Sequence, residues 1–216
     1  MATTPLLPDR GLLERYDRPG PRYTSYPTAP QFRGEFGESQ LRASIAASNG
    51  DPIPRRLSLY VHVPFCMSPC FYCGCNRIIT RDTTRGELYL ARLYREIALV
   101  SELFDRDREV IQLHFGGGTP NFLSPEQLGE CVKTLRRHFL FSEDEGRDIS
   151  IELDPRFVGP DDIARLAGLG FNRASLGVQD FDPVVQAAVN RIQSVEETRD
   201  VVEACRAHGF ASVNID

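Results

Sequence analysis

The sequence has 216 residues, enough for a full hydrophobic core, and its 41% hydrophobic and 25% charged content is that of an ordinary globular domain. A formal net charge of −5 argues against a nucleic-acid partner, because no basic excess is present to neutralise phosphates. The N-terminus lacks the pattern of a secretory signal, and no segment approaches the roughly 20 apolar residues that cross a bilayer, so we expect a cytoplasmic protein without a membrane partner.

The first 50 residues are expected to form an N-terminal arm, separate from a single domain at 51–216. The arm contains the segment RPGPRYTSYPTAPQF. Its prolines, at positions 19, 21, 27 and 30, exclude a continuous helix or a central strand. A short amphipathic helix is predicted to follow at about 38–48.

From residue 57 onward, short β-rich runs alternate with helical ones. Strands are predicted at 57–63, 110–115, 148–153, 173–178 and 212–216, and helices near 86–103, 124–139, 160–168 and 195–208. Five strands joined by four helical crossovers predict a parallel α/β sheet. Ser124, which precedes Pro125, is expected to cap the second of these helices.

The predicted strands alternate apolar and polar residues. In the first strand, Leu57, Leu59, Val61 and Val63 share one face, and Ser58, Tyr60 and His62 share the other. A parallel strand covered on both faces usually has an unbroken apolar run. We therefore expect a partial (β/α) barrel with parallel strands, outer helices and a polar lumen that binds a large polar ligand; the alternative is a sheet with one face in water. Because no helix follows the fifth strand, we expect a barrel truncated at about that point.

Four of the six cysteines lie within ten residues, which indicates a metal site. Cys66, Cys70 and Cys73 have C-x3-C-x2-C spacing, which supplies three thiolates, one fewer than usually hold a four-iron cluster. One iron would then remain open to a cofactor. Phe71 and Tyr72 would screen such a cluster from water.

Two alternatives remain for this segment. It could bind structural zinc, although zinc sites usually pair two C-x2-C knuckles and only one is present. Cys75 could instead be the fourth ligand of a closed electron-transfer cluster. The distant Cys131 and Cys205 lie in apolar-periodic stretches and are expected to be buried free thiols.

Other polar and glycine residues follow the remaining strands. Gly116–Gly118 and Thr119 follow the second strand, and Glu152 ends the third. Gln179 and Asp216 follow in the same way after the fourth and fifth. Carboxyl ends of parallel strands meet at one edge, so these residues are expected to surround the cysteines. Arg191 is a candidate partner for a ligand carboxylate.

Five segments carry a resemblance to a known family: YVHVPFCMSPCFYCGC, LHFGGGTPNFL, ISIELDP, GVQDFDPVVQAAVNR and YDRPGPRYTSYPTAPQF. Together they resemble the oxygen-independent coproporphyrinogen III oxidases (dehydrogenases) of heme biosynthesis, over essentially the whole chain. The resemblance implies an oxidoreductase of the radical S-adenosylmethionine type, with a 4Fe-4S cluster held by Cys66, Cys70 and Cys73. It implies contacts to S-adenosyl-L-methionine from Tyr60, Tyr72, Gly117, Gly118, Thr119, Glu152, Gln179, Arg191 and Asp216. Tyr72 stands where we expect phenylalanine.

The resemblance also implies the reaction. Propionate side chains of coproporphyrinogen III would be decarboxylated oxidatively to vinyl groups, through a 5′-deoxyadenosyl radical, to give protoporphyrinogen IX. Tyr60 and Cys75 are expected to act in catalysis, with Cys75 not ligating the cluster. A low-potential electron donor and an electron acceptor are expected partners of a monomeric enzyme, and a truncated chain is expected to bind the cluster with little turnover.

Two rival functions remain. A heme-trafficking chaperone of the same superfamily is similar around the cluster but lacks the C-G-C ending, so Cys75 and the Tyr-rich arm favour the oxidase. The other rival is a non-catalytic iron-sulfur protein.

Overall fold

The computed structural model describes residues 9–16 and 31–216. The chain divides into two units, Met1–Leu41 and Arg42–Asp216. Two helices come first: α1 (Arg10–Tyr16), which we did not predict, and α2 (Glu38–Asn49), which confirms the helix expected at 38–48. Most of the proline-rich arm, at 17–30, lies outside the described residues. None of the helices that are described is long and apolar enough to span a membrane.

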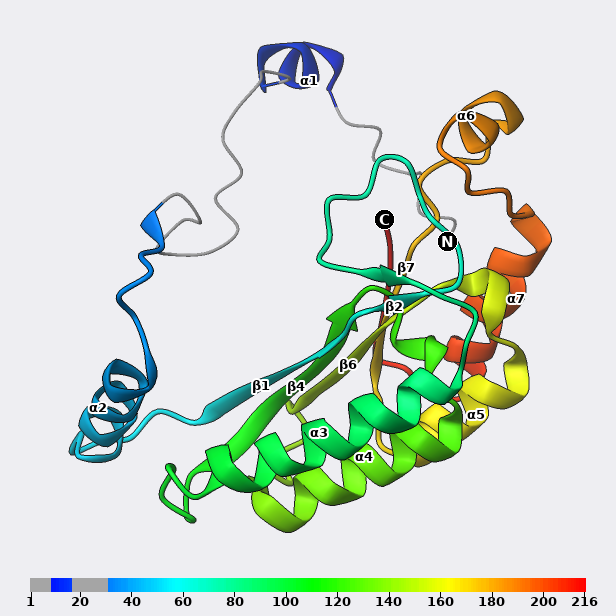
Figure 1. The fold of residues 1–216 in the computed structure, drawn as a ribbon. Helices are drawn as coiled ribbons and strands as arrows, with labels where there is room; N and C mark the ends of the chain where they lie inside the picture. The colour runs from blue at the N-terminus through cyan, green and yellow to red at the C-terminus, as the bar shows by residue number, and fades with distance from the viewer. Residues whose placement is uncertain (1–8, 17–30) are drawn as a thin grey trace. The chain divides into compact units, whose positions relative to one another are not determined.

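The second unit is built on a parallel sheet whose order follows the sequence, β1-β4-β6-β7-β8 (Figure 1). Its strands are β1 (Leu57–Val63), β4 (Glu109–Gly117), β6 (Asp148–Leu153), β7 (Arg173–Leu176) and β8 (Ser212–Ile215), and the short β5 (Leu140–Phe141) pairs with β4. Every neighbouring pair is parallel, which confirms the predicted sheet.

Helices connect successive strands. They are α3 (Thr84–Ser101), α4 (Pro125–His138), α5 (Pro160–Gly168), α6 (Pro183–Ala188) and α7 (Val195–Ala207), with 3₁₀ turns η2 (Pro120–Phe122) and η3 (Pro155–Phe157). In Figure 1, α3, α4 and α5 lie along one side of the sheet. Ser124 caps α4 as predicted, because its side chain accepts a hydrogen bond from the Gln127 N–H. The helix α6 was not predicted.

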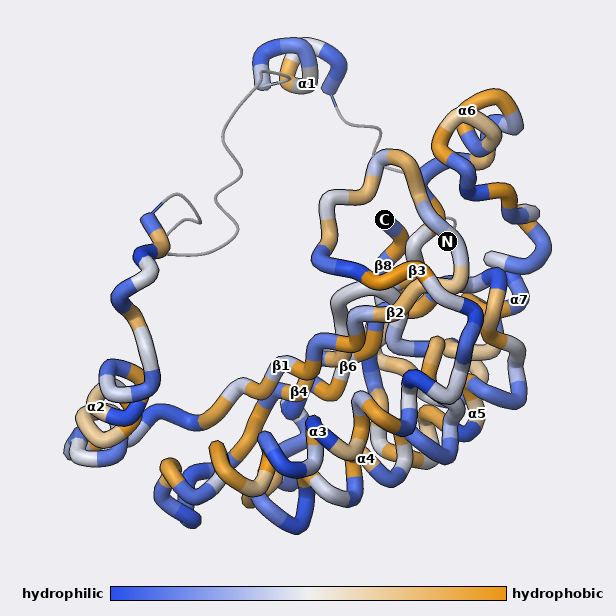
Figure 2. The backbone as a smooth tube through the Cα atoms, in the orientation of Figure 1, coloured by the Kyte–Doolittle hydropathy of each residue, from blue (hydrophilic) through white to orange (hydrophobic). Residues whose placement is uncertain are grey.

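Burial follows the predicted two-faced pattern. On the helix-covered face, Val63, Leu113, Phe115 and Ile151 are fully buried. The outer helices carry both hydrophobic and hydrophilic residues (Figure 2), as expected for helices with one face on a core. Cys131 and Cys205 are also fully buried without disulfides, which confirms the prediction of structural free thiols.

The opposite face of the sheet is polar. Parallel register places Tyr60 beside His114 and His114 beside Ser150 across three strands. Glu152 lies beside Ser175 on the next pair. The polar row ends at the carboxyl edge, where the cysteine-containing connection leaves β1.

Candidate active site

The cysteine loop, residues 66–77, lies between two very short strands that pair in parallel, β2 (Phe65–Cys66) and β3 (Ile78–Ile79). The Ile78 N–H donates to the Pro64 carbonyl at 2.6 Å, and the Thr80 N–H donates to the Cys66 carbonyl at 2.9 Å. These main-chain bonds close the base of the loop directly after β1 and hold it at the carboxyl edge of the sheet.

A pocket of about 240 Å³ opens at this edge. Most residues that the sequence singled out line it: Cys66, Cys70, Tyr72, Cys73, Cys75, Gly117, Gly118, Thr119, Glu152, Gln179, Arg191 and Asp216. Tyr60 does not line it but stacks on His114, with ring centroids 5.7 Å apart and planes tilted by 17°. The expected convergence of strand ends is therefore present.

The two aromatic residues of the loop differ in placement. Tyr72 lines the pocket, and burial raises the pKa of its hydroxyl to about 12. Phe71, which we also expected to screen a cluster, is 71% exposed and does not line the pocket. Its N–H donates to the Val189 carbonyl at 3.0 Å, which holds this part of the loop against the segment that follows α6.

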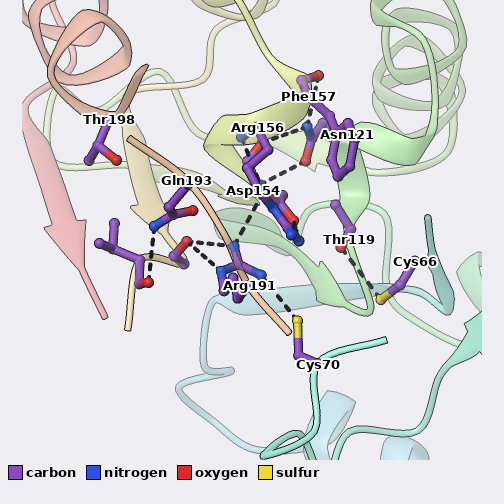
Figure 3. A network of polar contacts seen from close by, with 12 residues as sticks. Cys66, Cys70, Thr119, Asn121, Asp154, Arg156, Phe157, Arg191, Gln193 and Thr198 are labelled. Carbon is purple, nitrogen blue, oxygen red and sulfur yellow. Dashed lines mark hydrogen bonds and ion pairs between the residues drawn. The ribbon is translucent and has the colours of Figure 1, made fainter. Parts of the chain in front are cut away.

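The three candidate ligand thiols share the pocket, and each contacts a polar neighbour. The Thr119 hydroxyl donates to Cys66 Sγ at 3.5 Å, and an Arg191 N–H donates to Cys70 Sγ at 3.4 Å (Figure 3). The Cys75 N–H donates to Cys73 Sγ at 3.5 Å. Within the ranges that the structure describes, no three His, Cys, Asp or Glu side chains are gathered at metal-binding geometry. The three thiols line one pocket.

Two thiols of the loop hold their protons more tightly than free cysteine. Burial raises the pKa of the Cys66 thiol, and the hydrogen bond from Thr119 opposes this. Desolvation, followed by the hydrogen bond with Cys73, raises the pKa of the Cys75 thiol to about 11. Cys75 is therefore a neutral thiol at pH 7.

Glycines bring β4 close to the cysteine loop. Gly117 has a φ of 118°, a conformation that residues with a side chain rarely adopt. A Cβ on Gly118 would lie 2.7 Å from the Phe65 carbonyl oxygen and 3.0 Å from Cys66 Sγ. The Gly118 N–H donates to the Val63 carbonyl at 2.8 Å. Only glycine permits this approach of backbone to thiol.

Glu152 links the polar face of the sheet to this glycine turn. Its Oε2 accepts from the Gly117 N–H at 3.1 Å, and its Oε1 lies 3.2 Å from His114 Nε2. The other ring nitrogen of His114 lies 2.7 Å from the Ser150 hydroxyl. Beside these hydrogen-bonded side chains, burial raises the pKa of the Tyr60 hydroxyl, and the negative charge of Glu152 raises that pKa further. Tyr60 therefore stays protonated at neutral pH.

A buried ionic network supports the part of the pocket wall that Asp154 and Arg191 form (Figure 3). Asp154, 5% exposed, pairs with Arg156 at 2.7 Å and with Arg191 at 3.3 Å. The Arg191 Nε–H also donates to the Gly177 carbonyl at 3.1 Å. Arg191, which we expected to bind a ligand carboxylate, thus already has a carboxylate partner and contacts a candidate ligand thiol.

Sequence reasoning missed some residues at the site. Asp154 was noticed at a strand end but was not assigned to the site, although a carboxylate directly before a proline at that position could have indicated it. Ser175 and Arg77 line the pocket as well. Ser175 lies on the polar side of its strand, which is a usable signal. Nothing in the sequence distinguishes Arg77 from a surface arginine.

Comparison with known proteins identifies the class of protein. A profile of the Radical SAM superfamily matches residues 60–216, and the chain belongs to this superfamily. It is 52% identical over 208 residues to the oxygen-independent coproporphyrinogen III oxidase of Pseudomonas aeruginosa, a match that covers 96% of this chain and 45% of that protein. The corresponding enzyme of Escherichia coli is 45% identical over 208 residues, with coverage of 96% and 44%.

The solved structure of coproporphyrinogen III oxidase from Escherichia coli, described as a Radical SAM enzyme, gives a TM-score of 0.82 at 43% identity. The match covers 95% of this chain and 44% of that one. The chain therefore spans somewhat less than half the length of these relatives. The predicted fold, a partial α/β barrel of the radical SAM type, is confirmed.

Membership of the superfamily implies a 4Fe-4S cluster and S-adenosylmethionine as cofactors. The pocket fits them on two counts. Its donors include three soft thiols from one loop, the ligand type that iron-sulfur clusters require. The glycine turn beside Cys66 leaves space that any side chain would fill, so a ligand can approach the backbone there.

Proposed function

We propose that the protein carrying this chain decarboxylates the propionate side chains of coproporphyrinogen III oxidatively, without oxygen, and yields the vinyl groups of protoporphyrinogen IX. The observation that carries the proposal is the pocket in which three loop cysteines meet the glycine turn and the polar ends of four strands. The 52% identity to an enzyme named for this substrate supports the choice of substrate.

The chemistry defines the partners. Converting one propionate to a vinyl group removes one hydrogen atom, releases carbon dioxide and leaves one further electron. The proposal therefore includes a low-potential electron donor that starts each round and an acceptor that takes the last electron. It places the enzyme in the cytoplasm as a monomer.

When bound, the cluster and S-adenosylmethionine would supply the one-electron chemistry that abstracts a hydrogen atom from a carbon of the propionate side chain. In our proposal Cys66, Cys70 and Cys73 hold the cluster through their thiolates and leave one iron open. Tyr72 forms part of the wall of their pocket and would help to screen the cluster from water.

The remaining lining residues would orient the S-adenosylmethionine. Backbone groups of Gly117 and Gly118 and the Thr119 hydroxyl offer hydrogen-bonding atoms. Glu152 and Asp216 offer carboxylates that can accept from its amino and ribose groups. Gln179 can donate and accept, and Arg191, anchored by Asp154, offers a fixed positive charge.

Tyr60 and Cys75 are assigned to the reaction rather than to the metal. Both hold their protons at neutral pH, because burial raises the pKa of the Tyr60 hydroxyl and desolvation raises that of the Cys75 thiol. Tyr60 Oη lies 3.1 Å from His62 Nδ1, so the hydroxyl and the imidazole can share a proton through a hydrogen bond.

Alanine variants of the four loop cysteines test the ligand assignment. After anaerobic reconstitution, Cys66→Ala, Cys70→Ala and Cys73→Ala are expected to lose most bound iron, whereas Cys75→Ala, the matched control in the same loop, retains it. Adding S-adenosylmethionine to the reduced wild type is expected to change the paramagnetic resonance spectrum of the cluster, because one iron is open. Loss of iron in Cys75→Ala with an unchanged wild-type spectrum would indicate a closed cluster instead, and bound zinc would exclude the radical chemistry.

The substrate is tested by anaerobic incubation with coproporphyrinogen III, S-adenosylmethionine and a low-potential reductant. The expected products are carbon dioxide and a porphyrinogen with vinyl groups in place of propionates. Heme transfer without decarboxylation would contradict the proposal and favour the chaperone.

A further inference from the structure

Arg77 contacts the cysteine loop at three places from within. Its Nη1 donates to the carbonyl oxygens of Cys73 at 2.8 Å and Cys75 at 3.3 Å. Its Nη2 donates to the carbonyl of Cys70 at 3.3 Å. One side chain thus binds three main-chain oxygens of a single loop, and two of these belong to proposed cluster ligands.

A few other bonds hold this part of the loop. Within the loop, the Cys73 N–H donates to the Cys70 carbonyl at 3.2 Å and the Cys75 N–H donates to Cys73 Sγ. From outside, the segment after α6 binds Phe71 and Pro69, Arg191 donates to Cys70 Sγ, and His62 Nε2 lies 2.9 Å from the Asn76 carbonyl. The guanidinium is planar, and its donors have fixed directions, so it fixes the relative positions of the three carbonyls. A lysine keeps the charge but offers one nitrogen, which cannot reach three separated acceptors in this fixed arrangement.

Arg77 also places a cation at the pocket that the thiols line. Its Nε–H is buried and has no hydrogen-bond partner among the residues that the structure describes, so one donor of the group remains unused. Hydrogen bonds and net charge near a cluster set its reduction potential, and reduction adds one negative charge. A positive charge at this position therefore favours the reduced cluster.

We propose that Arg77 is a positioning residue that holds the cysteine loop in its ligand-binding conformation and raises the reduction potential of the bound cluster. The proposal rests on the three-cysteine cluster site proposed above and is independent of the choice of substrate. The side chain has two separate effects. Its guanidinium N–H groups hold the loop through hydrogen bonds, and its positive charge raises the reduction potential of the cluster.

The test compares Arg77→Gln, Arg77→Lys and the control Arg81→Gln in anaerobically reconstituted protein. Arg81 is exposed and makes no hydrogen bond or ion pair within the described ranges, so its loss removes an arginine charge four residues away without touching the loop. Iron release to a chelator measures how firmly the loop holds the cluster. A redox titration followed by paramagnetic resonance measures the potential.

We expect both Arg77 variants to retain iron roughly 10- to 100-fold less well than wild type, the usual effect of losing an outer partner of metal ligands. Arg77→Gln is expected to shift the potential to a more negative value, and Arg77→Lys, which keeps the charge, to shift it less. Arg81→Gln is expected to match wild type in both measurements.

Iron retention and potential equal to wild type in both Arg77 variants would overturn the proposal. Equal effects in Arg81→Gln would do the same, because they would show a general effect of net charge. If Arg77→Gln does not fold, the lysine variant decides through iron retention alone. A wild-type chain that binds no iron would overturn the cluster site itself, which distinguishes that failure from the failure of Arg77.

Discussion

Asn190 binds the outer side of the cysteine loop, and its own backbone has a conformation that few residues with a side chain adopt. Its φ is 55°, in the left-handed region where asparagine is enriched. Its Nδ2 donates to the Pro69 carbonyl at 2.7 Å, next to Cys70. The neighbouring Val189 carbonyl accepts from Phe71. The side chain of Asn190 therefore binds the loop directly, and its left-handed backbone conformation lies next to the Val189 carbonyl that also binds the loop.

Two substitutions distinguish these contributions. Asn190→Gly removes the side-chain hydrogen bond but suits the left-handed backbone, whereas Asn190→Ala removes the bond and adds a left-handed strain of about 1–2 kcal/mol. In urea unfolding of the metal-free chain, the alanine variant is expected to be less stable than the glycine variant by about 1 kcal/mol. A glycine variant that is the less stable of the two would contradict this account of the backbone.

At the scale of residues, the sequence predicts which residues belong to the site better than it predicts which residues contact one another. The cysteine spacing and the glycines after β4 are local features, and the structure places them together as expected. The partner of Arg191 could not be predicted, because Asp154 lies far away in sequence and meets it only through the packing of the η3 turn. Arg77 was missed for the same kind of reason, since its acceptors are carbonyls whose directions depend on the path of the loop.

At the scale of elements, α4 shows how local sequence fixes a boundary. Ser124 Oγ accepts from the Gln127 N–H at 3.2 Å, and Gln127 Oε1 accepts from the Ser124 N–H at 3.0 Å, a reciprocal capping box. The last turn carries Arg136, Arg137 and His138 near the free carbonyls of the helix. The two-residue strands β2 and β3 and the six-residue α6 were not predicted, because so few residues show no periodicity.

Substitution of the cap tests this account of α4. Ser124→Ala is expected to lower the free energy of unfolding by about 1 kcal/mol, because the Gln127 N–H loses its acceptor, whereas Ser124→Asp keeps an acceptor and is expected to stay near wild type. Urea denaturation followed by circular dichroism measures both. Equal losses in the two variants would show that the cap does not stabilise the helix.

At the scale of the whole molecule, stability depends on a core that includes ionisable groups. Cys131 of α4 is fully buried, and burial raises the pKa of its thiol from 9.0 to about 12. The folded state therefore favours the neutral thiol. This contribution to stability is complete below pH 9, where the unfolded thiol is also neutral, and it is lost as the pH rises from about 9 to about 12.

The pH dependence of unfolding tests this contribution with Cys131→Ala as the comparison. Between pH 7 and pH 10, wild type is expected to lose about 1.4 kcal/mol more than the variant, the equivalent of one pKa unit in the unfolded thiol. The measurement is urea unfolding of the reduced, metal-free chain at each pH. Parallel losses in the two proteins would show that this thiol is not held neutral by the fold.

The parallel pairing of β2 with β3 has a consequence for the way in which the cysteine loop is closed. Pro64 and Cys66 are bonded to Ile78 and Thr80 by main-chain groups alone, so the two ends of the cysteine loop meet without help from a metal. In a zinc finger, by contrast, the ion itself must bring distant ligands together, and the peptide stays unfolded until it arrives. Here hydrogen bonds of the polypeptide itself join the two ends of the segment that carries the cysteines, so closure of the loop does not depend on bonds to a metal.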